Sequence, residues 1–428
     1  MFWLKIENFE LEITFMAKLI FISFLFFTIL AFRFVDYYQN VPEYHDGDTF
    51  RITATLREEP ELLSGKQSFS LKTPDGVRIK IVTIAGPLYH FGDRLFIDGV
   101  FTKKEYKGFS TLTLYFPKIQ IARNDHNMIA QSAFYIKNKA KALYESVLSP
   151  IGASLLLGII FGGKEGMPET FSDALRTVGV FHVVAASGMN VSFVAGALLA
   201  LFGKIFRRPI ALVAGICGIV FYAFVAGFEP SIVRAAIMAV VAFSASLLGR
   251  QYLALFGTAF AGYVMLFLSP FLLFDVGFQL SFLSTMGILL IKPVLPLGKN
   301  MFLSDDIGTT IAAQIATLPV LLSVFGQYGV LSVLVNALVL WTVPVLMVFG
   351  SLGLLAGLIF APLGKLFIFL CLPFLLFFEK VVSLFGSSGW MVQIESFPVA
   401  ATVGYYLILV AVVLFINKRK DKPAPAQN

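Results

Sequence analysis

The sequence predicts a polytopic α-helical membrane protein with about ten spans and one small all-β domain near its N-terminus. Three observations predict this class. Apolar residues make up 57% of the chain and charged residues 14%, and a soluble protein of 428 residues could not solvate that much apolar surface. Apolar runs of spanning length recur from residue 182 onward. Residues 41–125 instead show short alternating runs and turn pairs, which are typical of β-strands.

The first element is an apolar stretch near residues 15–35, within an N-terminal segment of residues 1–40. Arg33 and Asp36 stand at its end, where a secretory signal would have small residues for cleavage, so we expect an uncleaved transmembrane helix. Lys5 precedes it and Lys18 lies near its N-terminal end. Short basic segments stay in the cytoplasm, which predicts a cytoplasmic N-terminus and an extracytoplasmic location for the next domain.

Residues 41–125 predict an extracytoplasmic, OB-like β-barrel domain. The expected strands cover residues 49–56, 68–73, 77–84, 94–103 and 110–116, and five short strands suit a small, partly closed barrel. Twelve Lys or Arg face ten Asp or Glu between residues 41 and 123, so charge alone argues weakly for nucleic acid.

One basic and aromatic cluster in this domain is a candidate DNA-binding surface, because bases stack on aromatic rings and cations pair with phosphates. A solvated loop is the alternative interpretation. The cluster comprises Lys103, Lys104, Tyr106, Lys107 and Phe109.

Residues 126–165 predict amphipathic or interfacial helices. Apolar residues recur at helical spacing from Phe134 to Val147, with lysines on the other faces, which indicates a helix at the membrane surface. The apolar run at 151–161 is too short to span and ends at Gly162 and Gly163, which favours a re-entrant or interfacial segment.

Residues 166–418 predict the main transmembrane domain, and residues 419–428 a cytoplasmic basic tail. Alternation of the spans places Arg250, Lys292, Lys299 and Lys365 on the same side as that tail, so both termini are expected inside. The expected spans, after the first one, are 182–203, 209–227, 231–248, 252–268, 272–291, 307–325, 333–358, 363–385 and 399–416.

The stretch from Thr177 to Val194 has polar residues where a lipid-facing span would have Leu or Val: His182, Ser187, Gly188 and Asn190. On a helix Ser187 and Asn190 share one face, whereas His182 lies roughly 140° away from Ser187. The glycine permits close approach of another backbone. We expect a chain that dips, turns and then spans, lining a hydrated space; helix-helix packing is the alternative.

Further polar residues occur inside later spans, and a helix contact or internal ion pair could explain each one alone. Together they predict a polar interior shared by several spans, as a conduit for a hydrated solute requires. These residues are Glu229, Arg234, Asp275, Gln279, Gln314 and Asn336.

The His182 to Asn190 stretch resembles the membrane domain of the ComEC family, and three later blocks agree in order and spacing. They are GFEPSIVRAAIMA from Gly227, SPFLLFDVGFQLSFLSTMG from Ser269 and AAQIATLPVLLSVFGQYG from Ala312. The chain departs from the family at Asn190, where His is usual. The resemblance implies a channel or permease that carries single-stranded DNA across the bacterial inner membrane in natural transformation. It also implies an N-terminal OB-like domain.

No phosphate-binding loop occurs in the sequence, so we expect a separate motor, with a separate DNA receptor and nuclease. Many family members have a C-terminal metallo-β-lactamase-like domain; no His-x-His-x-Asp-His cluster occurs in this sequence, so we expect another polypeptide to degrade the second strand. Two cysteines and four histidines predict neither a cofactor nor a metal. Oligomerisation stays open.

We therefore expect a transport protein that is no enzyme and whose partners are single-stranded DNA and membrane lipid. One alternative is an intramembrane serine hydrolase, with Ser187 as nucleophile and His182 as base, although their helical phase opposes a hydrogen bond. Another is a scaffold or small-solute transporter.

Overall fold

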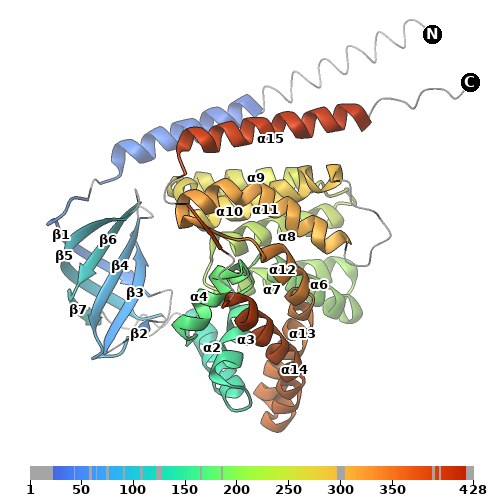
Figure 1. Cartoon of the computed structure of the whole chain (residues 1–428). Helices are drawn as coiled ribbons and strands as arrows, with labels where there is room; N and C mark the ends of the chain where they lie inside the picture. The colour runs from blue at the N-terminus through green and yellow to red at the C-terminus, as the bar shows by residue number, and fades with distance from the viewer. Residues whose placement is uncertain are drawn as a thin grey trace, which may run out of the picture.

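The computed structural model describes residues 23–420, with gaps at 43, 57–59, 64, 74–76, 90–91, 107–108, 122–127, 164–165, 185–186, 296–303, 388–390 and 395–396. A curled β-sheet lies at one end of a large helical part (Figure 1). The helical part has eight helices long and apolar enough to cross a membrane, within the searched residues. The chain is thus a polytopic α-helical membrane protein with an N-terminal, OB-like β domain.

The β domain is one seven-stranded sheet in the order β1-β5-β6-β4-β3-β2, with β7 also paired to β5. All five predicted strands are present. The strands are β1 (Thr49–Thr55), β2 (Glu61–Leu63), β3 (Lys66–Lys72), β4 (Arg78–Ile84), β5 (Arg94–Tyr106), β6 (Phe109–Tyr115) and β7 (Lys118–Ile121). Neighbouring strands pair antiparallel except β4 and β6, which are parallel.

Alternation of apolar residues gives this sheet its concave core. Side chains such as Ile79, Ile81, Leu95, Ile97 and Leu114 are almost fully buried and alternate with exposed positions along their strands. One face therefore packs inward, as period-two patterning requires.

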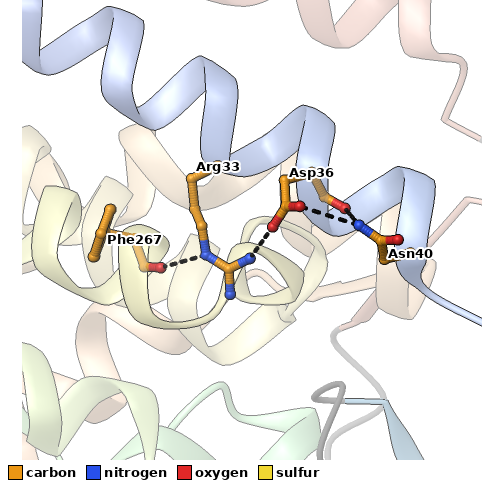
Figure 2. Close-up of polar contacts among 4 residues, drawn as sticks. All are labelled: Arg33, Asp36, Asn40 and Phe267. Carbon is orange, nitrogen blue, oxygen red and sulfur yellow. Dashed lines mark hydrogen bonds and ion pairs between the residues drawn. The ribbon is translucent and has the colours of Figure 1, made fainter.

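A helix over residues 23–40 follows the undescribed N-terminal residues and packs against α9 (Ala254–Leu268). The Phe26 and Tyr263 rings meet edge to face at 5.0 Å. The Arg33 guanidinium donates to the carbonyl of Phe267 at 3.3 Å and pairs with Asp36 at 3.1 Å, as Figure 2 shows. Because Phe267 lies in the last turn of α9, the arginine satisfies a carbonyl that the helix cannot pair itself.

Two helices connect the β domain to the bundle: α2 (Met128–Glu145) and α3 (Pro150–Phe161). The predicted amphipathic helix is α2, and its apolar face contacts α3, α13 and α14. Helix α3 has 12 residues and is buried along most of its length, so this short segment lies inside the protein. Non-spanning helices are tolerated at membrane depth where protein surrounds them.

The remaining helices form the bundle in Figure 1. They are α4 (Glu169–Thr177), α5 (Phe181–Val184), α6 (Gly188–Ile205), α7 (Arg208–Val225), α8 (Pro230–Leu247), α9, α10 (Val276–Leu290), α11 (Ser304–Phe325), α12 (Ser332–Val339), α13 (Thr342–Ile359), α14 (Ala361–Gly386) and α15 (Val399–Lys420). Short 3₁₀ turns η1 (Pro270–Phe274) and η2 (Lys292–Val294) flank α10.

The helices follow the predicted spans with several differences. The first expected span lies partly outside the described residues, since the structure describes it only from residue 23. The span expected at 182–203 is divided into α5 and α6, and the one expected at 272–291 begins with the 3₁₀ turn η1. The expected span at 333–358 is divided into α12 and α13, with the break at Leu340 and Trp341. Helix α9 has 15 residues and falls short of the spanning length. The connection after α11 also pairs with the one after α14 through two short strands, β8 (Gln327–Gly329) and β9 (Met391–Gln393).

Helix α15 contacts the bundle through hydroxyl groups that repair a proline break in α11. Pro319 lies inside α11 and has no N–H to donate to the carbonyl of Ile315. The Tyr405 hydroxyl donates to that carbonyl at 2.9 Å, and Tyr406 donates to the carbonyl of Ala316 at 2.9 Å. Freed backbone groups in a membrane need such partners.

Candidate functional site in the transmembrane helices

A turn precedes α6, as the sequence predicts. After α4, Gly179 turns the chain with φ at 73°, α5 makes one helical turn, and α6 begins at Gly188. A side chain at Gly179 would collide with Ser332 of α12, since an added Cβ would lie 2.7 Å from the serine Cβ. The turn is therefore held closely against α12.

Asn190 connects α6 to α3. Its amide nitrogen donates to the carbonyl of Ile159 at 2.7 Å, and its amide oxygen accepts from Ser187 at 2.9 Å. Ile159 lies in the last turn of α3, whose final carbonyls have no partner within the helix. Tyr222 of α7 similarly donates to the carbonyl of Ile160 at 2.8 Å. Two neighbouring helices thus cap the buried end of α3.

Ser187 and His182 have different partners. The serine hydroxyl donates to Asn190, while the exposed imidazole of His182 lies 3.1 Å from the carbonyl of Gly179 through Nδ1. The helix is interrupted between α5 and α6, so the helical phase does not apply here, but the described hydrogen bonds give the two side chains different partners. No described hydrogen bond prepares Ser187 for nucleophilic attack by drawing its proton to His182.

Arg234 is a buried charge in the first turns of α8, with 7% of its surface exposed. Its Nε donates to the Ser281 hydroxyl at 2.9 Å, and its Nη1 donates to the Thr285 hydroxyl, both on α10. Among the described residues no carboxylate forms an ion pair with it, so the internal pair with Glu229 is not observed. Neutral hydroxyl groups hold the guanidinium instead.

Gly188 allows α6 and α8 to approach. An added Cβ would lie 3.0 Å from Nη2 of Arg234 and 3.5 Å from Cβ of Ala235. The nearest neighbour is the guanidinium, and the nearest backbone atom of α8, the carbonyl oxygen of Ser231, would lie 4.0 Å from that Cβ. Gly188, Arg234, Ser281 and Thr285 therefore form one polar cluster, which we call the Arg234 cluster.

Two predicted polar residues shape the start of α10. Asp275 is its N-cap and accepts from the backbone N–H of Phe278 at 2.9 Å. Gln279 donates to the carbonyl of Leu273 at 2.8 Å, which fixes η1 against α10. Glu229 occupies the corresponding N-cap position of α8 and is half-buried. Pro230 and Gly277 are close neighbours, so the starts of α8 and α10 lie together.

Gln314 lies in a separate cluster between α11, β8 and α12. Its amide oxygen accepts from the Tyr328 hydroxyl at 2.7 Å, and its amide nitrogen donates to Ser332 at 3.0 Å. Asn336, one turn beyond Ser332, is 2% exposed, and its Oδ1 has no hydrogen-bond partner among the described residues. The predicted polar residues thus divide into two groups, one around Arg234 and one around Gln314.

The candidate DNA-binding cluster lies on the β5-β6 hairpin. The backbones of Lys103, Lys104, Tyr106 and Phe109 pair in its ladder, with Tyr106 opposite Phe109. Lys107 and the side chains of the other four fall outside the described residues.

Sequence reasoning missed the hydroxyl partners of Arg234 and Gln314, which are Ser281, Thr285, Tyr328 and Ser332, and it missed Tyr222, which caps α3. Hydroxyl residues are common in spans, so they give a weak signal by themselves. The signal that could have found Ser281 and Thr285 is their spacing of four, which places both hydroxyl groups on one face of α10.

These features define a multi-pass membrane protein with an OB-like domain and polar clusters between its spans. Residues 159–419 match the family model described as competence protein, and the chain belongs to that family.

Three curated relatives show the same likeness. ComE operon protein 3 of Bacillus subtilis (strain 168) is 23% identical over 346 residues, covering 76% of this chain and 44% of that protein. An uncharacterized protein of Aquifex aeolicus (strain VF5) is 27% identical over 230 residues, covering 54% of this chain and 53% of that protein. The uncharacterized protein YcaI of Escherichia coli (strain K12) is 30% identical over 107 residues, covering 23% of this chain and 14% of that protein. The chain thus matches about half or less of each relative, and no solved structure matches it.

Proposed function

We propose that this protein is a bacterial cell-membrane channel for the uptake of single-stranded DNA in natural transformation. The observation that supports this most is membership of the competence protein family over residues 159–419, the part that contains α4 to α15 and both polar clusters. In this proposal residues 166–418 form the channel domain. The β domain at 41–125 is extracytoplasmic and both termini are cytoplasmic, in agreement with the distribution of basic loops.

The path for the strand passes the Arg234 cluster. The starts of α8 and α10 are neighbours, and the start of α6 contacts Arg234, so three helix N-termini gather there. The N-termini of α8 and α10 already have the carboxylates of Glu229 and Asp275, so the start of α6 and a single guanidinium supply the attraction for negative charge, without an array of cations that would trap a polyanion. A strand carrying one charge per phosphate could bind there and still move on.

The strand enters by way of the β domain, whose β5-β6 hairpin bears the basic and aromatic cluster of Lys103 to Phe109. Channel and barrel bind the strand but do not cleave it, since transport requires no covalent step. Energy, DNA capture and degradation of the complementary strand are assigned to separate proteins, and the chain uses no cofactor.

The hydrolase alternative is disfavoured by the contacts of Ser187, whose hydroxyl bonds to Asn190 and leaves His182 to the carbonyl of Gly179. Labelling the membrane-embedded protein with a fluorophosphonate separates the two functions. A channel gives no specific labelling of Ser187, whereas stoichiometric labelling that disappears in Ser187→Ala would establish a nucleophile.

The direct test is uptake of labelled DNA into the cytoplasm of the competent bacterium that encodes this chain, with the gene deleted and then restored. We expect the deletion to retain surface DNA binding and lose cytoplasmic entry. Restoration with a chain of normal membrane abundance should recover entry. Normal transformation in the deletion strain would refute the proposal.

A further inference from the structure

The Arg234 guanidinium is a buried cation whose described hydrogen-bond partners are all neutral. Nε and Nη1 bond to the hydroxyls of Ser281 and Thr285, and Nη1 also lies 3.8 Å from the sulfur of Met238. No described carboxylate is within ion-pair distance. A charged side chain within a span is costly unless it is paired or serves a function. Two hydroxyl dipoles supply hydrogen bonds but no opposite charge.

The nitrogen that lacks an acceptor faces the start of α6. Nη2 has no hydrogen-bond partner among the described residues, and it lies 3.0 Å from the position where a Cβ of Gly188 would be. The described side-chain N and O atoms that are fully buried without a partner are Ser172 Oγ and Asn336 Oδ1. Nη2 is not among them, so part of its surface is accessible.

The start of α6 adds a second positive element. Ser187 occupies the N-cap, but its side chain makes no cap hydrogen bond and donates to Asn190 instead. The first N–H groups of a helix have no partner within it, and the helix dipole places partial positive charge there. A cation beside an uncapped helix N-terminus is electrostatically unfavourable unless an anion lies between them.

We propose that Arg234 and the uncapped start of α6 form a binding site for a phosphodiester group of the DNA strand. This inference rests on the proposed function and assigns the residue that contacts the cargo. A guanidinium presents a planar fork of donors that matches phosphate oxygens, and Ser281 and Thr285 fix the orientation of that fork. Gly188 lets the start of α6 lie against Nη2, because a side chain there would meet the guanidinium.

The neutral surroundings explain how such a site can release its ligand. One guanidinium and one helix terminus hold a single phosphate, and the next phosphate along the strand can replace it. Lysine clusters in the same place would bind several phosphates at once and slow the strand.

The test compares Arg234→Met with wild type in the purified full chain, reconstituted in nanodiscs of neutral lipid. Binding of a fluorescent oligothymidylate is measured as a function of salt concentration. We expect the slope of log affinity against log salt to fall by about 0.7 in Arg234→Met, the value for one lost phosphate contact on a single strand. Arg208→Met is the matched control: Arg208 is exposed and bonds to Ser246, and its variant should keep the wild-type slope.

An uncharged probe and a stability measurement complete the test. A methylphosphonate oligothymidylate should show equal affinity for wild type and Arg234→Met. The thermal midpoint of Arg234→Met, without ligand, should equal or exceed that of wild type, because an apolar residue replaces an uncompensated buried charge. A clearly lower midpoint would identify Arg234 as a structural residue and overturn the site.

The outcomes separate this inference from the proposed function. Wild type that binds the oligothymidylate, with an unchanged slope in Arg234→Met, overturns the phosphate site and leaves the channel proposal standing. Failure of wild type to bind or take up DNA refutes the channel proposal itself. Arg234-dependent thermal stabilisation by phosphatidylglycerol but not by the oligothymidylate would assign the site to a lipid headgroup and overturn the inference.

Discussion

Gly188 is the residue at which the smallest change should have the largest effect. An added Cβ would lie 3.0 Å from Nη2 of Arg234, and valine adds two further methyl groups. Overpacking of this kind costs about 1–3 kcal/mol. Ser187→Ala removes one hydroxyl bond, worth about 0.6–2 kcal/mol between membrane helices. We expect Gly188→Val to reduce DNA uptake far more than Ser187→Ala, measured at equal membrane abundance.

Asn190→His belongs to the same series. Histidine retains a ring N–H that can reach the carbonyl of Ile159, so uptake should be preserved, whereas Asn190→Ala leaves that buried carbonyl unpaired. Loss of uptake in Ser187→Ala together with normal uptake in Gly188→Val would contradict the expected order and point to a nucleophilic serine.

The sequence predicts that polar side chains such as Asn190 and Arg234 need hydrogen-bond partners, but it does not predict which residues those partners are. Asn190 and Ile159 are 31 positions apart, and Arg234 and Ser281 are 47 apart. Such pairs depend on which helices are neighbours, and helical periodicity within one segment contains no information about that. Contacts within one element, such as Ser187 with Asn190, follow directly from a spacing of three.

The proline in α11 leaves one backbone carbonyl without its usual donor, and α15 supplies a hydroxyl group to it. In the wild-type helix the carbonyl of Ile315 has no backbone donor at position 319 and accepts from Tyr405. Tyr405→Phe should therefore destabilise the protein by about 1–3 kcal/mol, the cost of an unpaired buried acceptor. In a Pro319→Ala background the new N–H replaces the hydroxyl, so the same change should cost almost nothing. Denaturation of the micelle-solubilised protein measures this double-mutant cycle.

Tyr406→Phe is the control for that cycle. Its acceptor, the carbonyl of Ala316, faces a normal backbone donor at residue 320, so its cost should be the same with Pro319 or Ala at position 319. Equal costs for Tyr405→Phe in both backgrounds would show that the hydroxyl does not compensate for the proline.

The β5-β6 hairpin is the element expected to contact DNA outside the membrane. Replacement of Lys103, Lys104 and Lys107 by Ala in the full chain should lower the salt slope of oligothymidylate binding by about 0.7 for each lost phosphate contact. Replacement of Lys137, Lys139 and Lys141 on α2 removes the same charge and should leave the slope unchanged. Equal slopes in the hairpin variant and wild type would mean that the hairpin is solvated.

The topology of the whole chain is tested with single cysteines. The chain has Cys217 and Cys371, so two replacements give a cysteine-free background. A cysteine at exposed Lys118 in the β domain should react with an impermeant maleimide in intact spheroplasts. One at exposed Lys418 should react only after permeabilisation. Protection of position 118 in spheroplasts would reverse the orientation of every span.

Fold class and helix positions could be predicted because length and hydropathy determine them locally. The β domain was predictable for the same reason, since alternation marks each of its five main strands. Division of the span at 333–358 was not predictable, because Leu340 and Trp341 are as apolar as their neighbours and the break depends on packing. Pairing of β8 with β9 joins loops more than 60 residues apart in the chain, and no local pattern encodes it.

The two tyrosines of α15 also impose an order on synthesis. Ile315 and Tyr405 are 90 residues apart, and a ribosome adds roughly 5–20 residues per second. The carbonyl of Ile315 is therefore without the Tyr405 hydroxyl for roughly 5–20 s after its own synthesis, until Tyr405 has been added to the chain. During that interval water or a translocase must solvate the carbonyl, and insertion of α15 ends this dependence.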